Sequence, residues 1–192
     1  MSAGVLLLWL AAAAVDYELA PAPGNRLTLE VFKTGLMRGK KHVFEFERYR
    51  GSLVYDAATP EAARVQLVME AAAVVLKDTW LSPKDFQKVQ RYALEEMLDA
   101  ARRPEIRFSS SAVRAAGPGR FEVEGNLTIR GAAKPVVVQV TRTAPRCFEG
   151  SARVRMTDYG LKPPAAGLGT VGTRDEMAFS FTLCAESAAP RP

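Results

Sequence analysis

The amino-acid sequence predicts an all-β protein with one inserted helix, folded as a closed antiparallel β-barrel of about eight strands. Three observations predict this class. Between residues 103 and 140, apolar and polar residues alternate in three successive runs separated by turn residues, which is typical of antiparallel strands with one buried face. Similar short runs precede and follow this stretch, and only one segment has helical spacing. Closure into a barrel leaves such a series of strands without exposed edges.

The length of 192 residues suits one domain, which we place at residues 15–186. Residues 1–14, MSAGVLLLWLAAAA, form an apolar run that ends in small residues, the layout of a secretory signal peptide. We therefore expect a periplasmic or secreted protein. Because no Lys or Arg precedes the apolar run, an uncleaved membrane anchor is the alternative. The proline-bearing tail at 187–192 is expected to fray.

Strands in the first half of the domain are recognised by period-two alternation and by glycine or proline at the breaks between them. Two prolines and a glycine at 20–24 end the first strand. In the third strand Phe44 and Phe46 share a face with His42, and we expect this face to point inward. The expected strands are residues 17–19, 27–33, 42–49, 52–56 and 64–75.

One helix is expected to begin at Ser82 and to end near residue 101. Ser82 is a good N-cap, Pro83 fits the first turn, and Asp85 favours the positive end of the helix dipole. Apolar residues then recur at three- and four-residue spacings, which gives the helix one stripe for packing. The stripe consists of Phe86, Val89, Ala93, Leu94, Met97 and Ala101.

Strands resume after Pro104 with the run that contains Ile106 and Phe108. Turns rich in glycine, proline and alanine separate the later runs. The segment 158–174, which joins the last two runs, is rich in glycine and proline and shows no clear regular element. The later strands are expected at residues 121–129, 136–140, 148–156 and 177–183.

Two cysteines, Cys147 and Cys184, fall on the last two predicted strands. Strand parity puts both on the outer face, since Phe148 and Leu183 beside them belong to the inward series. Two antiparallel strands can bring such residues opposite each other, and export would place them in an oxidising compartment. We predict a cross-strand disulfide, with two free thiols as the alternative.

The formal charge of +5 and the isoelectric point near 9.4 would fit a nucleic-acid binder. The basic residues, however, are spread over strands and helix, without a dense tract or an aromatic platform for bases. We expect no nucleic-acid partner. We expect most of the charge to belong to a solvated face. A second interpretation of the charge is attraction to anionic lipid head groups, with transient contact to a membrane surface.

The sequence does not indicate catalysis. His42 is the only histidine, so a His-based metal cluster cannot be built, and a Ser-His-Asp triad has no second histidine in reserve. The carboxylates do not converge on a glycosidase-like acid pair. The glycines at 167 and 169 are not followed by a predicted helix, whereas a phosphate-binding glycine loop leads directly into one. We therefore expect no catalytic residue, no metal and no cofactor.

Several separated sequence words occur in a fixed order between residues 17 and 183. They are YEL at 17–19, GSLVYD at 51–56, PEIRF at 104–108, GNLTIRGAAKPVVV at 125–138 and DYGLKP at 158–163. Together they resemble the YceI-like family of bacterial lipid-binding proteins. The resemblance implies a lipocalin-like barrel with a long apolar cavity, a polyisoprenoid or related amphiphilic lipid as the bound ligand, and export to the periplasm.

The sequence departs from the family pattern in two places. The Asp and His-Ser that usually follow the first strand are replaced by Ala20, Pro23 and Gly24. A Gly-His-x-His word found in one branch of the family reads Gly39-Lys40-Lys41-His42 and keeps only the second histidine. A paired-histidine metal site is therefore not supported.

Inward-facing apolar residues are candidates for the wall of a lipid cavity, although the same pattern would equally fill a solid core. Only the family resemblance favours the cavity. The candidates are Phe44, Phe46, Leu67, Met69, Phe108, Phe121, Phe179 and Phe181.

Basic residues near a barrel rim are candidates for binding a phosphate or another polar lipid end: Lys40, Lys41 and His42, with Lys162 at the barrel mouth. The alternative is a solvated basic loop beside a packed histidine. Tyr159, three residues before Lys162, would in the simpler interpretation anchor its turn by packing.

We therefore expect a non-enzymatic protein that holds a polyisoprenoid-type lipid for transport, storage or sequestration. An enzyme that uses His42 or Tyr159 on a hydrophobic small molecule is one alternative. A structural or interaction module with a filled barrel is another. The sequence leaves the oligomeric state open.

Overall fold

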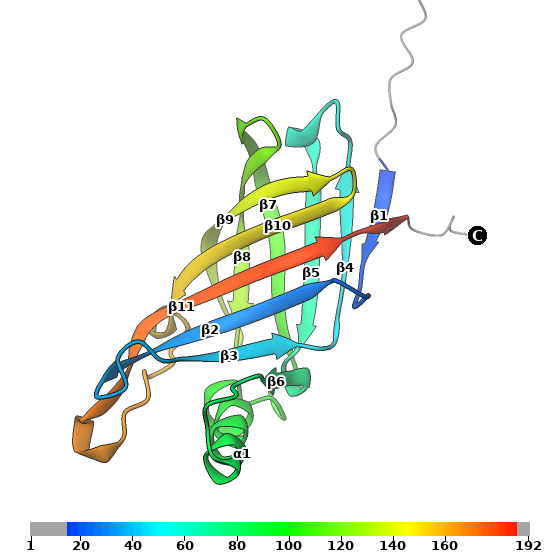
Figure 1. Cartoon of the computed structure of the whole chain (residues 1–192). Helices are drawn as coiled ribbons and strands as arrows, with labels where there is room; N and C mark the ends of the chain where they lie inside the picture. The colour runs from blue at the N-terminus through cyan, green and yellow to red at the C-terminus, as the bar shows by residue number, and fades with distance from the viewer. Residues whose placement is uncertain (1–14, 188–192) are drawn as a thin grey trace, which may run out of the picture.

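Antiparallel strands form most of the chain in the computed structural model, which describes residues 15–187. They belong to one sheet that curls around an apolar interior, and the one α-helix of the described residues lies at one end of it (Figure 1). The strands are β1 (Val15–Leu19), β2 (Arg26–Gly35), β3 (Lys41–Phe46), β4 (Tyr49–Tyr55), β5 (Arg64–Glu70), β6 (Val74–Leu76), β7 (Glu105–Gly117), β8 (Arg120–Ile129), β9 (Ala132–Ala144), β10 (Cys147–Arg155), β11 (Val171–Cys184) and β12 (Glu186–Ser187); the helix is α1 (Pro83–Tyr92).

Short bends divide four of the strands in two, so that the segments follow eight paths. The pairs β1 and β2, β3 and β4, β5 and β6, and β11 and β12 each continue one another. Hydrogen-bond partners support this grouping, because β2 pairs with β3 and β11 while β1 pairs with β4 and β12. Each path therefore has a hydrogen-bonded neighbour on both sides, and the sheet closes into a barrel.

The predicted class, an antiparallel barrel with one inserted helix, is confirmed. The described residues contain twelve strand segments rather than about eight, and the excess comes from the bends. Pro21, Pro23 and Gly24 interrupt the first path, since proline lacks the backbone donor and Gly24 adopts a positive φ of 86°.

Side chains alternate between the interior and the outside, as the sequence pattern predicts. In β8, Phe121, Val123, Leu127 and Ile129 are buried at alternate positions. Phe44 and Phe46 of β3 are also buried, at 6% and 1% exposure. The aromatic face of this strand is therefore the inner one.

The helix begins where the sequence predicts and ends earlier. The Ser82 hydroxyl accepts a hydrogen bond from the Asp85 backbone N–H at 3.2 Å. Regular α-helix stops at Tyr92, and a π-helical turn, Ala93–Met97, follows instead of further α-helix to residue 101. The Gln90 side chain donates to the Val74 carbonyl and accepts from the Leu76 N–H. The helix thus satisfies the free edge of β6.

The later strands are longer than predicted. β11 begins at Val171, inside the segment that was expected to lack regular structure, because its first residues pair with the end of β2. Cys147 and Cys184 are directly opposite in the β10–β11 register and form a disulfide. The predicted cross-strand disulfide is confirmed.

No helix within residues 15–187 is both long enough and apolar enough to cross a membrane. The signal-peptide prediction for residues 1–14 concerns a part of the chain outside the described residues, as does nearly all of the 187–192 tail.

Candidate ligand-binding site

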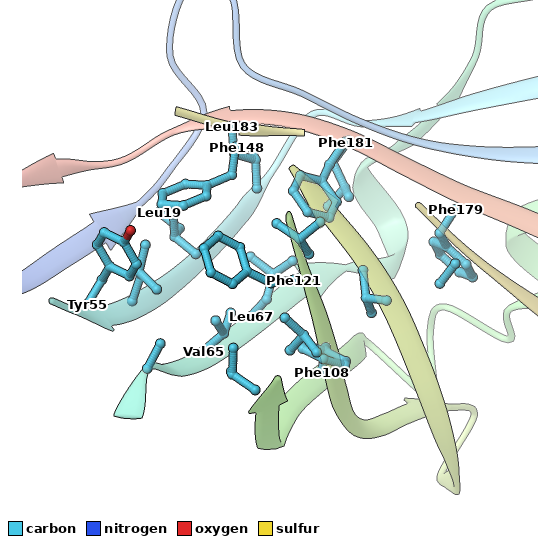
Figure 2. Close-up of a pocket in the computed structure, with 18 of the residues that line it drawn as sticks. Leu19, Tyr55, Val65, Leu67, Phe108, Phe121, Phe148, Phe179, Phe181 and Leu183 are labelled. Carbon is cyan, nitrogen blue, oxygen red and sulfur yellow. The ribbon is translucent and has the colours of Figure 1, made fainter. Parts of the chain in front are cut away.

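The barrel encloses a cavity of about 140 Å³ with an entirely apolar wall, which we call the apolar chamber. Inward side chains converge on it from strands on all sides of the barrel (Figure 2). The phenol of Tyr55 presents only its ring, since its oxygen accepts a hydrogen bond from Arg142 at 2.7 Å. The wall consists of Leu19, Leu27, Leu53, Tyr55, Pro60, Ala63, Val65, Leu67, Met69, Phe108, Val113, Phe121, Val123, Leu127, Val138, Val140, Phe148, Ala152, Phe179, Phe181 and Leu183.

A wall without polar groups suits a hydrocarbon chain. A polar ligand atom buried there would lose its hydrogen bonds to water without replacement, at a cost of about 1–3 kcal/mol. An apolar chain would instead gain about 0.8 kcal/mol for each methylene removed from water. The chamber therefore selects the apolar part of a ligand.

A second cavity of about 600 Å³ lies between the end of the barrel, helix α1 and the segment that leads into β11. We call it the basal chamber. Much of its wall is apolar, and four methionines, residues 37, 97, 156 and 177, supply adaptable surface. Its polar wall residues include Lys33, His42, Ser82, Asp85, Lys88 and Thr173.

The two chambers follow each other along the barrel axis. On β2, Leu27 lines the apolar chamber and Leu29 lines the basal one, and on β11 Phe179 and Met177 divide in the same way. Phe46 stacks on Phe179, with 6.3 Å between the ring centroids. This aromatic pair lies at the level where one chamber gives way to the other.

The basal chamber contains a histidine held by a buried carboxylate. His42 Nδ1 lies 2.6 Å from Asp78 Oδ2, and the other oxygen of Asp78 accepts the Val43 backbone N–H at 2.9 Å. The Asp78 side chain is only 1% exposed. Trp80 stacks on the imidazole at 5.4 Å between centroids. Because Nδ1 is engaged, Nε2 is the ring nitrogen left for a ligand.

Lys33 adds a cation to the same chamber. Burial lowers the pKa of its ammonium group, and the negative charge of Asp78 opposes that effect. Within residues 15–187, no carboxylate forms an ion pair with Lys33. A partly desolvated cation beside an imidazole favours a ligand group that is anionic or accepts hydrogen bonds.

Six of the eight predicted wall residues line the apolar chamber: Leu67, Met69, Phe108, Phe121, Phe179 and Phe181. Phe44 lines the basal chamber, and Phe46 belongs to the aromatic pair between the two. The barrel thus has hollow space at most of the positions that the sequence proposed.

The four predicted head-group residues are not gathered at one place. His42 lines the basal chamber. Lys41 pairs with Glu30, and the Lys40 ammonium lies 5.4 Å from the centre of the Trp80 ring. Lys162 is exposed and is not part of the basal wall.

Sequence reasoning missed Lys33 and Asp78. Lys33 continues the inward series Leu27, Leu29 and Val31 of β2, so period two could have placed it. Asp78 lies between β6 and α1, outside any regular element. Its hydrogen bond with His42 is a tertiary contact that the spacing of residues in the sequence does not predict.

Tyr159 lies outside the walls of both chambers. It is buried at 4% exposure, and within the described residues its hydroxyl has no hydrogen-bond partner. Burial raises its pKa to about 12, and the charge of Asp158 adds to the effect. The phenol therefore stays protonated near neutral pH.

Two further arrangements bear on catalysis. The Ser82 hydroxyl, the one serine hydroxyl that residues 15–187 contribute to the basal wall, donates to Asp85 at 2.7 Å and caps the helix. It is engaged there rather than with His42. No group of three or more His, Cys, Asp or Glu residues within 15–187 is arranged to hold a metal ion.

A closed antiparallel barrel with an apolar interior and one polar end defines a lipocalin-like β-barrel protein. The YceI-like domain model matches residues 22–185, and the chain belongs to this family. The family prediction made from the sequence words is confirmed.

Curated relatives and solved structures agree with this assignment. The chain is 30% identical over 132 residues to a UPF0312 protein of Pseudomonas savastanoi pv. phaseolicola. The aligned region covers 62% of this chain and 63% of the relative. A UPF0312 protein of Azotobacter vinelandii is 28% identical over 126 residues, covering 61% of this chain and 62% of that protein. The chain thus spans somewhat less than two thirds of the curated relatives it matches.

Two solved structures share the fold. BcnA of Burkholderia cenocepacia superposes with a TM-score of 0.64 at 22% identity, covering 82% of this chain and 94% of that one. The YCEI protein of Campylobacter jejuni gives a TM-score of 0.57 at 14% identity, with coverages of 77% and 85%. At these identities the likeness concerns the fold alone.

Proposed function

We propose that the protein binds one amphiphilic lipid of the polyisoprenoid type, without catalysis, for transport, storage or sequestration. The observation that carries the proposal is that an apolar chamber and a partly polar chamber follow each other along the barrel axis. The first has no polar wall atom, and the second contains His42 and Lys33. A ligand with a hydrocarbon chain and one polar end matches this order.

Cavity size limits how the chain is held. The apolar chamber, about 140 Å³, is close to an engineered cavity of about 150 Å³ that binds benzene. By this comparison it has room for roughly one isoprene unit. A longer isoprenoid would extend into the basal chamber or would displace the Phe46–Phe179 pair. Burial of ten carbons across both chambers would supply about 8 kcal/mol before the costs of association.

The disulfide supports a location outside the cytoplasm, since such bridges persist in oxidising compartments. We infer that the protein is exported, in line with the apolar residues 1–14. Mass spectrometry of the mature protein from its native host would show whether these residues are removed.

Extraction of the purified protein with organic solvent, followed by mass spectrometry, tests the ligand class. We expect about one prenyl lipid per protein chain. Protein that is prepared empty allows a titration with farnesol and farnesyl phosphate, read by the fluorescence of Trp80, whose ring stacks on His42. Trp80→Phe is the control for the origin of the fluorescence change.

Farnesyl phosphate is expected to bind about tenfold tighter than farnesol, because one charge-assisted hydrogen bond contributes about 1.5–3 kcal/mol. Lys33→Gln should remove most of this preference and leave the affinity for farnesol unchanged. An empty extract together with no saturable binding of either probe would contradict the proposal.

A further inference from the structure

Two loops lie side by side at the end of the barrel that holds the basal chamber (Figure 1, lower left). They are the β2–β3 turn, residues 36–40, and the loop at 163–170 that precedes β11. The Leu36 backbone N–H donates to the Thr170 carbonyl at 3.0 Å. We call the pair of loops the tip.

The backbone fixes the tip as one unit. Gly35 has a φ of +63°, and a Cβ atom there would lie 2.0 Å from the Thr170 carbonyl oxygen, so only glycine allows the loops to approach this closely. Within the second loop, the Thr170 hydroxyl donates to the Gly167 carbonyl, and Ala166 bridges to Val171. The tip is therefore held by its own hydrogen bonds.

Each loop exposes a leucine to solvent. Leu36 is 82% exposed and Leu168 is 108% exposed, the two largest values among the large apolar residues of the described chain. Leu168 also has a positive φ of 54°, between two glycines of the same handedness. A leucine in this conformation has a strained backbone, which lowers the stability of the loop. Its apolar side chain is at the same time exposed to water.

The charge around these leucines has one sign. Residues 31–41 contain four Lys or Arg, residues 160–174 contain two, and neither segment contains an Asp or Glu. Lys33 lines the basal chamber and Lys41 pairs with Glu30. The other four cations are exposed and have no carboxylate partner within residues 15–187: Arg38, Lys40, Lys162 and Arg174. Two of them, Arg38 and Lys162, are exposed close to the leucines in sequence.

We propose that the tip docks on an anionic phospholipid surface. Leucines projecting from a basic surface match the boundary between head groups and acyl chains, where apolar side chains insert while cations contact phosphates. Met37, Ala166 and Val171 belong both to the tip or its edge and to the wall of the basal chamber. Docking would thus hold that chamber against the bilayer. The inference goes beyond the ligand proposed above and does not depend on it.

Cosedimentation with large vesicles tests the proposal. Vesicles of phosphatidylcholine with about 30% phosphatidylglycerol should retain the wild-type protein at low salt. Retention should fall by at least about tenfold on pure phosphatidylcholine or in 0.5 M NaCl, because screening shortens the range of the attraction.

The variant Leu36→Ser with Leu168→Asn should reduce binding to the anionic vesicles by at least about tenfold, since two inserted side chains are lost. Asparagine is chosen at 168 because it tolerates a positive φ. Val137→Ser is the matched apolar control, at a 46%-exposed valine on the outer face of β9. It should bind like the wild type.

The charge contribution is tested by Arg38→Gln with Lys40→Gln, compared with Arg26→Gln with Arg120→Gln at the opposite end of the barrel. Only the first pair should weaken binding. Unchanged circular dichroism spectra show that the variants are folded. The proposal is overturned if wild-type protein fails to bind anionic vesicles, or if the leucine variant binds as well as the wild type. Farnesol binding by the same leucine variant should persist, which separates failure of docking from failure of the ligand proposal.

Discussion

His42 owes its setting to two residues of the short segment between β6 and α1. Asp78 engages its Nδ1 atom, and Trp80 covers the ring. Asp78 also accepts the Val43 backbone N–H, so one carboxylate fixes both the imidazole and the strand that carries it. A buried carboxylate with these partners is satisfied. The histidine is thereby held in the wall of a chamber to which Lys33 and Lys88 add cations that have no ion pair among the described residues.

Tyr159 gives a residue-scale prediction with a defined pH window. Its pKa is raised from the usual 10.0 to about 12 in the folded protein. Between these values the folded state holds a proton that the unfolded state releases, so the free energy of unfolding should fall as pH rises from about 10 to 12. Tyr159→Phe should remove this part of the alkaline loss.

At pH 7 the free energy of unfolding of the same variant should exceed that of the wild type by about 1 kcal/mol, because a buried hydroxyl without a partner is removed. Urea unfolding at pH 7 and at several values above pH 10 measures both effects. Tyr92→Phe, at a tyrosine that is 42% exposed, is the control. A Tyr159→Phe variant with the same alkaline decline as the wild type would refute the assignment.

At the scale of elements, local chemistry predicts the start of α1 better than its end. The Ser82 cap is recognisable because an N-cap needs a particular side chain at one position. The end of α1 is not, since the apolar stripe continues through Ala93, Leu94 and Met97 into the π-helical turn. The early start of β11 is equally hidden, because it depends on pairing with β2, distant in sequence.

The disulfide joins the first residue of β10 to the last residue of β11. Its half-cystines are 37 residues apart in sequence. A bridge closing a loop of this length restricts the unfolded chain by about 3–4 kcal/mol. Cys147→Ser with Cys184→Ser should lower the free energy of unfolding by about that amount.

Urea denaturation of the double variant and of the wild-type protein, with and without reductant, measures the effect of the bridge. The reduced wild type should match the variant. Equal midpoints for the oxidised wild type and the variant would show that the bridge does not stabilise the fold.

At the scale of the whole molecule, closure of the sheet creates the interior in which a ligand can reside. Inward side chains from paths far apart in the sequence meet in the apolar chamber (Figure 2). The sequence pattern identified these side chains and left open whether they fill the barrel. The chambers of about 140 and 600 Å³ answer that question in favour of hollow space.

Filling the apolar chamber should separate ligand binding from folding. Val65 is a half-buried residue of the chamber wall. Val65→Trp should place an indole in the space proposed for the hydrocarbon chain and weaken farnesol binding by at least about tenfold, while the free energy of unfolding changes by less than about 3 kcal/mol. Val137→Trp, on the outer face, is the matched control and should bind farnesol normally. Full affinity in a folded Val65→Trp variant would place the chain elsewhere.

The sequence by itself determined the class of fold, the inward face of most strands, the start of the helix and the outward side of both cysteines. These features follow from period-two alternation, from local capping chemistry and from parity, all of which act between near neighbours or within one strand. Only the tertiary structure decided that the barrel is hollow, that Asp78 and Lys33 accompany His42, and that Leu36 and Leu168 share one basic tip. Each of these depends on groups that are distant in sequence, and side-chain volume and three-dimensional contact determine them rather than periodicity.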